Sequence, residues 1–511
     1  MNRALRITAG LAFALLCLAP ILIMLTRVGV SDLENLGSER TLGLLGRTLR
    51  LGLHSTLIAV LIGAPFGFLL ARTDVPGASL MRPLGIVPLV LPPLFLAITW
   101  TAVFELRGPW ATALVLGVNT FPLVALFTAK AAARIDARRE EAALLVGGLG
   151  TALRMELPLL LPGILTGAAL AFAFAVNDWS VPDYISSVGP KFNVYADEIF
   201  ANWQLEANTG KAVVTALPLV LVTLAALLPA LSLRRRGALA TLDGDFRRPA
   251  PLRLGVWRWP AFAFCAAVVL FAVCGPIARL AFEAGGGTRG FTTTAFREAM
   301  ATTLEFEREF LANSLIWSAV AATIAVPLAL VIAHAIERLR GGRWLEPIVL
   351  LPIAVPAILF GIGTINLWNH DATAEIYDGN AMILLLYLGR FLAFPILVLS
   401  GAVAALDPRL EEAAELAGAG PLRRLRAIVA PPLRPSLVGG WVLVFVFAMR
   451  ELDAAVLVPA ANHTVIFKAY NRIHFARDDS VAALCLLILF FLVLPGLLWS
   501  LFAREKLEVL P

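Results

Sequence analysis

The residues best placed to do chemistry in this chain are two glutamates, each of which starts the same short pattern. The pattern is Glu-Ala-Ala, three variable residues and a glycine, and both copies lie between long apolar runs. The copies comprise Glu141, Ala142, Ala143 and Gly147, and Glu412, Ala413, Ala414 and Gly418. A carboxylate pairs with an arginine or lysine of a partner, and small alanines allow close approach. These residues therefore predict the docking of another protein.

The local sequence around each glutamate predicts the element that presents it. Glu and Ala are strong helix formers, and the glycine permits a sharp break. A basic stretch and a proline follow, with Arg154 and Pro158 in the first copy and Arg423 and Pro431 in the second. We expect a short helix, a turn and a second helix lying across a membrane surface.

The duplication extends well beyond the pattern. Pro83, Pro88 and Pro92 recur with identical spacing as Pro347, Pro352 and Pro356, and Phe174 to Asp178 corresponds to Phe447 to Glu451. Self-similarity over such a length indicates repeated structural units. The repeated prolines are expected to kink their helices and shape the bundle rather than to contact a substrate. We predict a first half at residues 1–236 with its docking loop at about 134–158, a linker at 237–258, and a second half at 259–511 with its loop at about 405–431.

Composition places the chain in a membrane. Hydrophobic residues make up 59% of the sequence and charged residues 15%, which leaves too little polar surface for a soluble globule. The expected fold is all-α, with about twelve transmembrane helices in two six-helix halves. The predicted spans are Ala4–Leu25, Leu51–Ala71, Pro83–Phe104, Trp110–Ala131, Leu159–Val176, Val213–Leu233, Ala261–Phe282, Ser314–Ala335, Pro347–Trp368, Met382–Ala404, Leu437–Met449 extended to Leu457, and Val481–Phe502.

Arginine placement predicts the orientation, because cytoplasmic loops are enriched in arginine and lysine. The connection between the halves is rich in arginine and contains only two acidic residues, Asp243 and Asp245. Its arginines are Arg234, Arg235, Arg236, Arg247, Arg248, Arg253 and Arg258. Counting spans outward from this connection places both termini and both Glu-Ala-Ala loops in the cytoplasm. The formal charge of +6 reflects this pattern, so we expect no nucleic-acid partner.

Charged residues lie where the penultimate helix of each half meets its outer loop. In the first half this residue is Asp178, and in the second half the residues are Arg450, Glu451 and Asp453. Charges near membrane helices are costly unless they pair or line a cavity. They are either solvated helix ends or residues of a transport pathway, and both readings stay open. The four cysteines lie singly in apolar stretches, so neither a disulfide framework nor a metal site is expected.

The spacing from Glu412 through Gly418 and Ile428 to Pro431 resembles the signature of the permease subunits of binding-protein-dependent ABC importers with the type I fold. The chain as a whole resembles the fused two-half permeases of ferric iron importers and, more distantly, the fused thiamine permease. Arg450 to Ala454 resembles a segment of the iron-type permeases, although Asp453 stands where that family has glycine. The first docking loop is two residues shorter between its glycine and its proline.

The resemblance implies the partners and the mechanism. The two loops would be coupling helices that dock on a homodimeric cytoplasmic ATPase, which binds ATP and Mg. A periplasmic or extracellular binding protein would deliver the substrate, and transport would follow alternating access in a bacterial inner membrane. The chain itself lacks a phosphate-binding loop, so it is expected to bind no cofactor and to hydrolyse no ATP.

Several alternatives remain. Ferric iron is the first substrate by resemblance, with thiamine, a polyamine or a phosphonate behind it. A secondary transporter with twelve helices is the main rival, but it would carry ionisable residues inside its spans, and the predicted spans here are almost free of charge. A membrane-embedded enzyme ranks third, because no His, Cys or carboxylate set shares one membrane depth.

Overall fold

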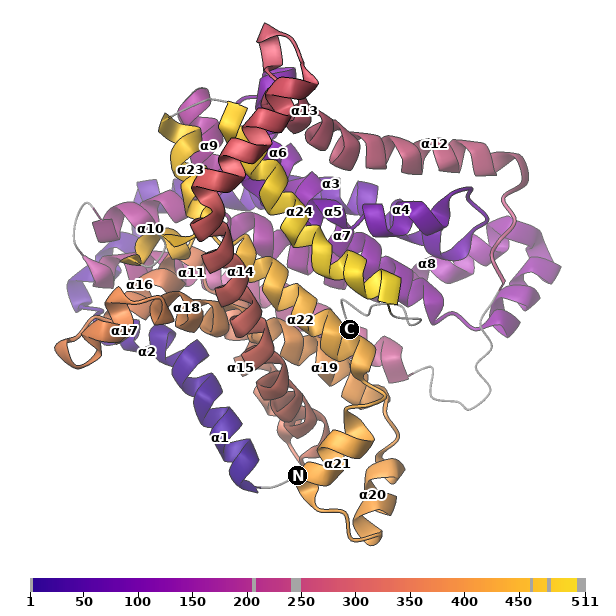
Figure 1. Cartoon of the computed structure of the whole chain (residues 1–511). Helices are drawn as coiled ribbons and strands as arrows, with labels where there is room; N and C mark the ends of the chain where they lie inside the picture. The colour runs from indigo at the N-terminus through magenta and orange to yellow at the C-terminus, as the bar shows by residue number, and fades with distance from the viewer. Residues whose placement is uncertain (1–2, 205–207, 240–249, 460–462, 476–478, 503–511) are drawn as a thin grey trace. The chain divides into compact units, whose positions relative to one another are not determined.

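The computed structural model describes residues 3–204, 208–239, 250–459, 463–475 and 479–502. Over these ranges nearly every residue is in a helix or a turn, and the β structure consists of one isolated parallel bridge between Thr73 and Leu252. The predicted all-α class is confirmed. Figure 1 labels the helices in chain order.

The elements fall in two runs along the chain, one on each side of the gap at residues 240–249. Those before the gap are α1 (Arg3–Phe13), η1 (Ala14–Leu18), α2 (Ala19–Leu25), η2 (Val30–Gly37), α3 (Glu39–Arg72), α4 (Ala78–Leu84), α5 (Val87–Val90), α6 (Pro93–Phe104), α7 (Gly108–Ala133), α8 (Ala137–Asn177), α9 (Ser180–Val188), α10 (Tyr195–Gln204) and α11 (Thr209–Leu239). Those after it are η3 (Gly255–Trp257), α12 (Arg258–Val269), η4 (Leu270–Cys274), α13 (Gly275–Ala284), η5 (Gly287–Arg289), α14 (Thr293–Arg338), η6 (Gly342–Leu345), α15 (Glu346–Ala354), α16 (Ala357–Trp368), η7 (Asp371–Thr373), α17 (Ala374–Asp378), α18 (Ala381–Phe391), α19 (Ala393–Ala405), α20 (Pro408–Leu416), α21 (Pro421–Arg424), η8 (Leu425–Val429), α22 (Arg434–Met449), η9 (Ala455–Leu457), α23 (Val465–Phe475) and α24 (Asp479–Phe502).

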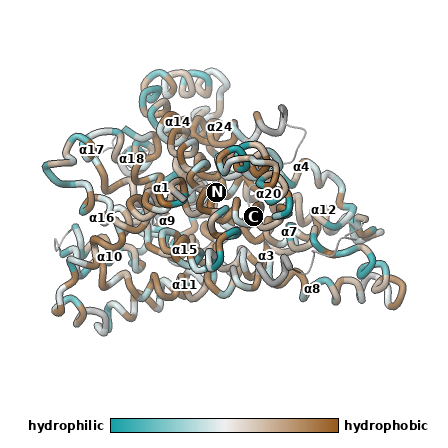
Figure 2. Tube along the Cα trace, turned by 90° about the horizontal axis from the view of Figure 1, so that it is seen from below, coloured by the Kyte–Doolittle hydropathy of each residue, from teal (hydrophilic) through white to brown (hydrophobic). Residues whose placement is uncertain are grey.

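Many of these helices are long and apolar enough to cross a bilayer. Among the described residues there are 8 such helices, or up to 12 if each of 4 bent helix pairs counts as one span. The number agrees with the two sets of six predicted from the sequence. Figure 2 shows hydrophobic residues along much of the helical bundle and hydrophilic residues at short elements such as α17 and α20.

Two predicted spans are bent where the repeated prolines lie, as the sequence predicts. Pro83–Phe104 and Pro347–Trp368 are each broken into two helices, with bends of 96° and 98° respectively. The breaks fall at Pro92 and Pro356, which are among the repeated prolines. A proline disfavours the helical conformation of the residue before it. Leu91 and Val355 are accordingly extended, with ψ of 134° and 129°.

Each bend leaves backbone carbonyls without a helical partner inside an apolar bundle, where an unsatisfied carbonyl is costly. The helix that begins the next predicted span supplies a donor in both halves. The Asn119 side chain, from α7, donates to the carbonyls of Pro88 and Leu91 at 2.5 Å and 3.0 Å. Arg390, from α18, donates to the carbonyl of Val355 at 3.2 Å. In both repeats a side chain from another helix thus donates to the carbonyls freed at the bend, but the residue is asparagine in the first repeat and arginine in the second.

One further span ends earlier than predicted. The span predicted from Leu437 to Leu457 ends at Met449, and a separate short helix, η9, follows. The predicted linker at 237–258 begins inside α11 and ends at the start of α12, and its residues 240–249 lie outside the described ranges.

The described contacts divide the chain into two compact units, and each contains parts of both halves of the sequence. One unit comprises residues 1–37, 198–217 and 281–511, so the first membrane helix belongs with the second half. The other comprises residues 38–197 and 218–280, which include α12. This grouping by contact differs from the grouping by repeat and does not test the predicted boundaries at residues 236 and 258.

Within the second of these units, α3 packs closely against α7 because glycines face it. A Cβ built on Gly63 would lie 2.5 Å from the carbonyl oxygen of Phe121, and one on Gly67 would lie 2.2 Å from that of Ala125. Only a residue without a side chain fits at these two positions. The close contact fixes α3, whose last residue, Arg72, carries part of the site described next.

Candidate functional site

The second Glu-Ala-Ala copy has the predicted helix, turn and helix. Asp407 caps α20, its Oδ1 accepting from the backbone N–H of Arg409 at 2.9 Å, and Pro408 occupies the first helical position. The helix ends at Leu416, and Gly418 follows in the left-handed region with φ of +79°. The next helix, α21, begins at Pro421. Local sequence alone accounts for each of these boundaries.

The motif residues of this copy lie on an exposed element. Glu412, Ala413 and Gly418 are exposed, Ala414 is half-buried, and no residue of α20 is buried. Leu416 is 91% exposed, which is unusual for a large apolar side chain at the end of a helix. An exposed carboxylate thus lies beside exposed leucine and alanine, a combination typical of protein-binding surfaces.

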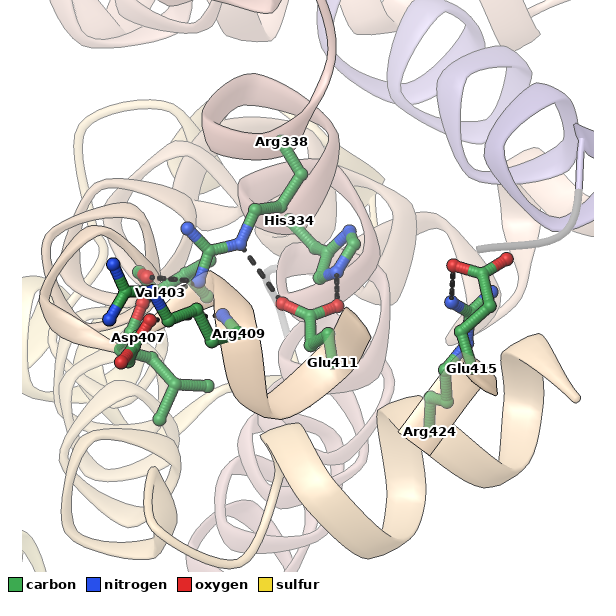
Figure 3. Close-up of polar contacts among 9 residues, drawn as sticks. His334, Arg338, Val403, Asp407, Arg409, Glu411, Glu415 and Arg424 are labelled. Atoms are coloured by element: carbon green, nitrogen blue, oxygen red, sulfur yellow. Dashed lines mark hydrogen bonds and ion pairs between the residues drawn. The ribbon is translucent and has the colours of Figure 1, made fainter. Parts of the chain in front are cut away.

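The neighbouring residue, Glu411, points the other way and anchors the loop (Figure 3). Its Oε1 accepts from Arg338 Nε at 2.9 Å, and its Oε2 lies 2.6 Å from His334 Nε2. Both partners lie in the last turns of α14. Arg338 also donates to the backbone carbonyls of Leu406 and Val403, at 2.6 Å and 3.2 Å. One guanidinium therefore joins α14 to both sides of the start of α20.

The charge on Glu411 is favoured by this environment. Burial by itself would raise the pKa of its carboxyl group, but the hydrogen bonds and charges of His334 and Arg338 outweigh burial, so the pKa is lowered from its ordinary value. A second ion pair, between Glu415 and Arg424, links α20 to α21 across the turn. Glu415 is largely exposed, so this pair contributes little, about 0–1 kcal/mol.

The first copy has the same elements in a different form. Asp136 caps α8, its Oδ1 accepting from the backbone N–H of Arg138 at 2.8 Å. The break falls at Gly147 and Gly148, and the left-handed residue is Gly148, with φ of +66°. The sequence predicts the break at Gly147, the position that corresponds to Gly418. In the structure the left-handed residue follows Gly147 by one position.

The motif residues of the first copy also divide between two faces. Glu141, Ala142 and Gly147 are exposed and Ala143 is buried. Leu145 and Val146, just before the break, are 88% and 86% exposed. The first loop thus presents a larger apolar surface beside its glutamate than the second loop does.

The anchor is repeated in the first copy. Glu140, which immediately precedes Glu141, is buried and forms an ion pair with Arg72, the last residue of α3. Arg72 also lies 3.5 Å from an oxygen of Glu156, on α8 beyond the break. Arg72 and Arg338 each end a long helix, and each holds the glutamate before the motif. Sequence reasoning missed these anchors, although the extra glutamate before both motifs was a visible signal.

The four charged residues predicted at the outer ends of the spans make local structural contacts. Asp178 Oδ1 accepts from the N–H of Val181 at 3.0 Å, and Glu451 Oε1 accepts from the N–H of Ala454 at 2.8 Å. Both are contacts from a carboxylate to the backbone N–H three residues later, at corresponding places in the two repeats. Arg450 lies over the Phe447 ring, 5.0 Å from its centroid, and Asp453 is half-buried. Their role in a transport pathway stays a prediction.

Glu451 also lies 3.8 Å from Arg390. Arg390 lies within α18, inside the predicted span Met382–Ala404, so the expectation of nearly uncharged spans overlooked it. Its charge is compensated by Glu451 and by the carbonyl of Val355, as a charge inside a bundle requires. Among the described residues, no group of three or more His, Cys, Asp or Glu is placed to hold a metal ion.

Comparison with known proteins identifies the family. Residues 63–284 and 325–505 match the family described as "Binding-protein-dependent transport system inner membrane component". The chain is 22% identical over 500 residues, 96% of both chains, to the Fe(3+)-transport system permease protein FbpB 2 of Haemophilus influenzae. It is 26% identical over 194 residues, 37% of this chain and 69% of the relative, to the putrescine transport system permease protein PotI of Escherichia coli. It is 30% identical over 240 residues, 43% of this chain and 88% of the relative, to the molybdenum transport system permease protein ModB of Mycobacterium bovis.

Proposed function

Because the chain belongs to the family of binding-protein-dependent transport system inner membrane components, we propose that it is the transmembrane permease subunit of an ATP-driven importer of ferric iron. Ferric iron is proposed as the substrate because the chain aligns with an iron permease along 96% of both chains, and the alignment spans both repeats. The relatives named for putrescine and molybdenum match only 37% and 43% of this chain. A polyamine is the second candidate, ahead of thiamine and phosphonate.

The partners follow from what the chain contains and lacks. Its sequence has no phosphate-binding loop, so a separate cytoplasmic ATPase binds ATP and Mg. A homodimer of that ATPase presents two equal grooves, and the chain presents two Glu-Ala-Ala loops. A soluble binding protein delivers the substrate on the opposite side. The arginine-rich connection between the halves supports a cytoplasmic position for both loops and both termini.

The docking surface of each loop consists of its exposed glutamate and the apolar residues before its glycine break. In the first loop these are Glu141, Leu145 and Val146, and in the second they are Glu412 and Leu416. The apolar side chains fill the groove of the ATPase, and the carboxylate pairs with a basic residue at its edge. Small alanine side chains keep the two docking helices narrow enough to enter the groove of the ATPase. These are Ala142, Ala143, Ala413 and Ala414.

The anchors explain how movement of a loop reaches the bundle. Glu411 ties the second loop to the end of α14, which has 46 residues, and Glu140 ties the first to the end of α3, which has 34. Closure of the ATPase dimer would draw the loops together, and the long helices would turn with them. A docking contact can shift the inward-open and outward-open states only if its affinity differs between them.

Uptake of labelled substrates tests the proposal. Cells that carry the chain with its native ATPase and binding protein are supplied with radiolabelled ferric iron, putrescine or molybdate, with and without depletion of ATP. The proposal predicts ferric uptake that stops on depletion. Uptake of putrescine alone would change the proposed substrate but leave the chain assigned to an ATP-driven importer. Uptake that persists after ATP depletion would exclude an ATP-driven importer.

A further inference from the structure

A cationic pocket lies where α3 and α7 begin, within the unit that comprises residues 38–197 and 218–280. Its volume is about 350 Å³. Arg47, Arg50 and His54 line it from α3, and Trp110 and Phe192 line it from α7 and the segment before α10. The His54 and Trp110 rings are in contact, with centroids 4.4 Å apart. The pocket thus combines two arginines, an imidazole and two aromatic rings.

Among the residues that the structure describes, the arginines of this pocket have no compensating anion. Arg47 and Arg50 each donate through Nε to a carbonyl one turn earlier in their own helix, those of Gly43 and Gly46, at 3.4 Å and 3.3 Å. Over the part of the chain that the structure describes, neither guanidinium forms an ion pair. Their terminal nitrogens therefore remain available for a ligand that carries negative charge.

The pocket lies at the N-terminal end of an apolar stripe on α3 that is suited to contact with lipid chains. Leu53, Leu57 and Leu61 are 61%, 55% and 62% exposed and follow one another at helical spacing on α3. Arg50 precedes Leu53 by one turn on the same face. Trp110, near the start of the α7 span, is 66% exposed, as tryptophans at a membrane interface are. An apolar stripe that ends in arginine and tryptophan matches the boundary between acyl chains and headgroups.

The distance along α3 gives the depth of the pocket in the membrane. Arg50 and Arg72 are separated by a helix length of about 33 Å at 1.5 Å per residue. The hydrocarbon core of a bilayer is about 30 Å thick. Since Arg72 anchors the first docking loop at one surface, Arg50 lies at headgroup depth on the opposite surface.

The second repeat shows that the fold does not require these cations. The Thr48 hydroxyl accepts from the N–H of Tyr195, and the Ser314 hydroxyl accepts from the N–H of Val465, each at 2.8 Å, so Thr48 and Ser314 are equivalent positions. By this register, Arg47, Arg50 and His54 correspond to Asn313, Ile316 and Val320. The same helix thus forms in the second repeat with neutral residues at all three positions. The cations of the first repeat therefore call for an explanation other than folding.

We propose that this pocket binds the phosphate headgroup of an anionic phospholipid in the leaflet opposite the docking loops. Arginine recognises phosphate oxygens with paired hydrogen bonds, and the leucine stripe below Arg50 accommodates an acyl chain. That continuity favours a lipid over an acidic protein surface. The name of the leaflet, the outer one, rests on the orientation given under the proposed function, but the binding itself does not.

The test uses the purified full chain in detergent, titrated with phosphatidylglycerol, phosphatidylethanolamine or inorganic phosphate and observed by native mass spectrometry. The test variant is Arg47→Asn with Arg50→Ile, which places the residues of the second repeat in the first. The control variant, Arg297→Gln with Arg308→Gln, removes two exposed arginines from α14. Two arginines near an anionic lipid are expected to change the affinity by roughly 30-fold.

The proposal predicts that the test variant loses about that factor in affinity for phosphatidylglycerol, while the control and the affinity for phosphatidylethanolamine are unchanged. Equal retention of phosphatidylglycerol by the test variant would overturn it. So would phosphate binding as tight as that of the lipid, which would indicate a site for a free anion. No ATPase or substrate is present, so failure of the proposed transport function leaves this result unaffected.

Discussion

Replacing Glu411 by alanine should loosen the second docking loop without harming α20 as a helix. Alanine is the best helix former, so intrinsic propensity cannot cause a loss. The change removes the carboxylate that joins His334 and Arg338, at 2.6 Å and 2.9 Å. Breaking a buried ion pair costs about 3–5 kcal/mol. The side chains of Glu411 and Arg338 are 14% and 18% exposed, which favours the lower end, about 3 kcal/mol.

Hydrogen exchange measures this loss where it occurs, because local opening exposes the amides of α20. A loss of about 3 kcal/mol corresponds to roughly 150-fold faster exchange of the amides in residues 408–416. The matched control is Glu412→Ala, one residue away and exposed, which should change exchange by less than about twofold. Equal exchange in the wild type and Glu411→Ala would refute the anchor, and equal acceleration by both variants would show that position in α20 matters more than the ion pair.

Three further predictions concern the same loops. Glu412→Lys should abolish uptake while the protein remains in the membrane fraction at wild-type levels, because a reversed charge repels a basic groove; normal uptake would contradict docking through this residue. Gly148→Ala and Gly418→Ala should each weaken ATPase binding roughly 5- to 30-fold, because a left-handed backbone conformation costs residues other than glycine about 1–2 kcal/mol. An added Cβ meets nothing within 4 Å at either position, so a larger loss of affinity would require a cause other than this strain. Because the pKa of Glu411 is lowered in the folded protein, the stability from its ion pair is fully present above the ordinary pKa of 4.5. This stability is lost as the pH falls through the lower folded-state pKa. Protection of the α20 amides, corrected for intrinsic exchange, should fall in that window in the wild type but not in Glu411→Ala.

The class of fold was predictable because apolar runs report membrane spans almost directly. The repeated prolines predicted kinks, and the structure has them at Pro92 and Pro356, but the sequence did not predict that each kink is a full break. A proline inside an apolar run is compatible with a mild kink or a full break. Which one occurs depends on whether a neighbouring helix can satisfy the freed carbonyls, as Asn119 and Arg390 do, and that contact is not encoded in the run itself.

The exposed part of the docking loops was predictable, and their anchors were not. The Glu-Ala-Ala pattern marks a helix, and glycine marks its end, so the local geometry follows from the residues present. The partners of Glu140 and Glu411 lie 68 and 73 residues away in sequence, at the ends of α3 and α14. Such pairings depend on the packing of the bundle. The internal repeat was the available signal, because an arginine ends a long span and a glutamate precedes the motif in both halves.

The contact units also could not be predicted from the repeat. The sequence divides into two similar halves, but the first membrane helix belongs with the second half and α12 belongs with the first. Apolar helices carry little information about which apolar face they will contact, since lipid and protein offer similar surfaces. Repeat analysis therefore gives the elements and their order, and tertiary contacts decide their grouping.

Recovery of an ATPase with the tagged chain from its native membrane tests the central claim most directly. The wild type, Glu141→Lys, Glu412→Lys and the double variant are purified in mild detergent, and co-purifying proteins are quantified by mass spectrometry. We expect two ATPase subunits for each wild-type chain, fewer with either single variant, and none with the double variant. Recovery of no ATPase with the wild type, or equal recovery with all four proteins, would contradict the assignment of the two loops as its docking sites.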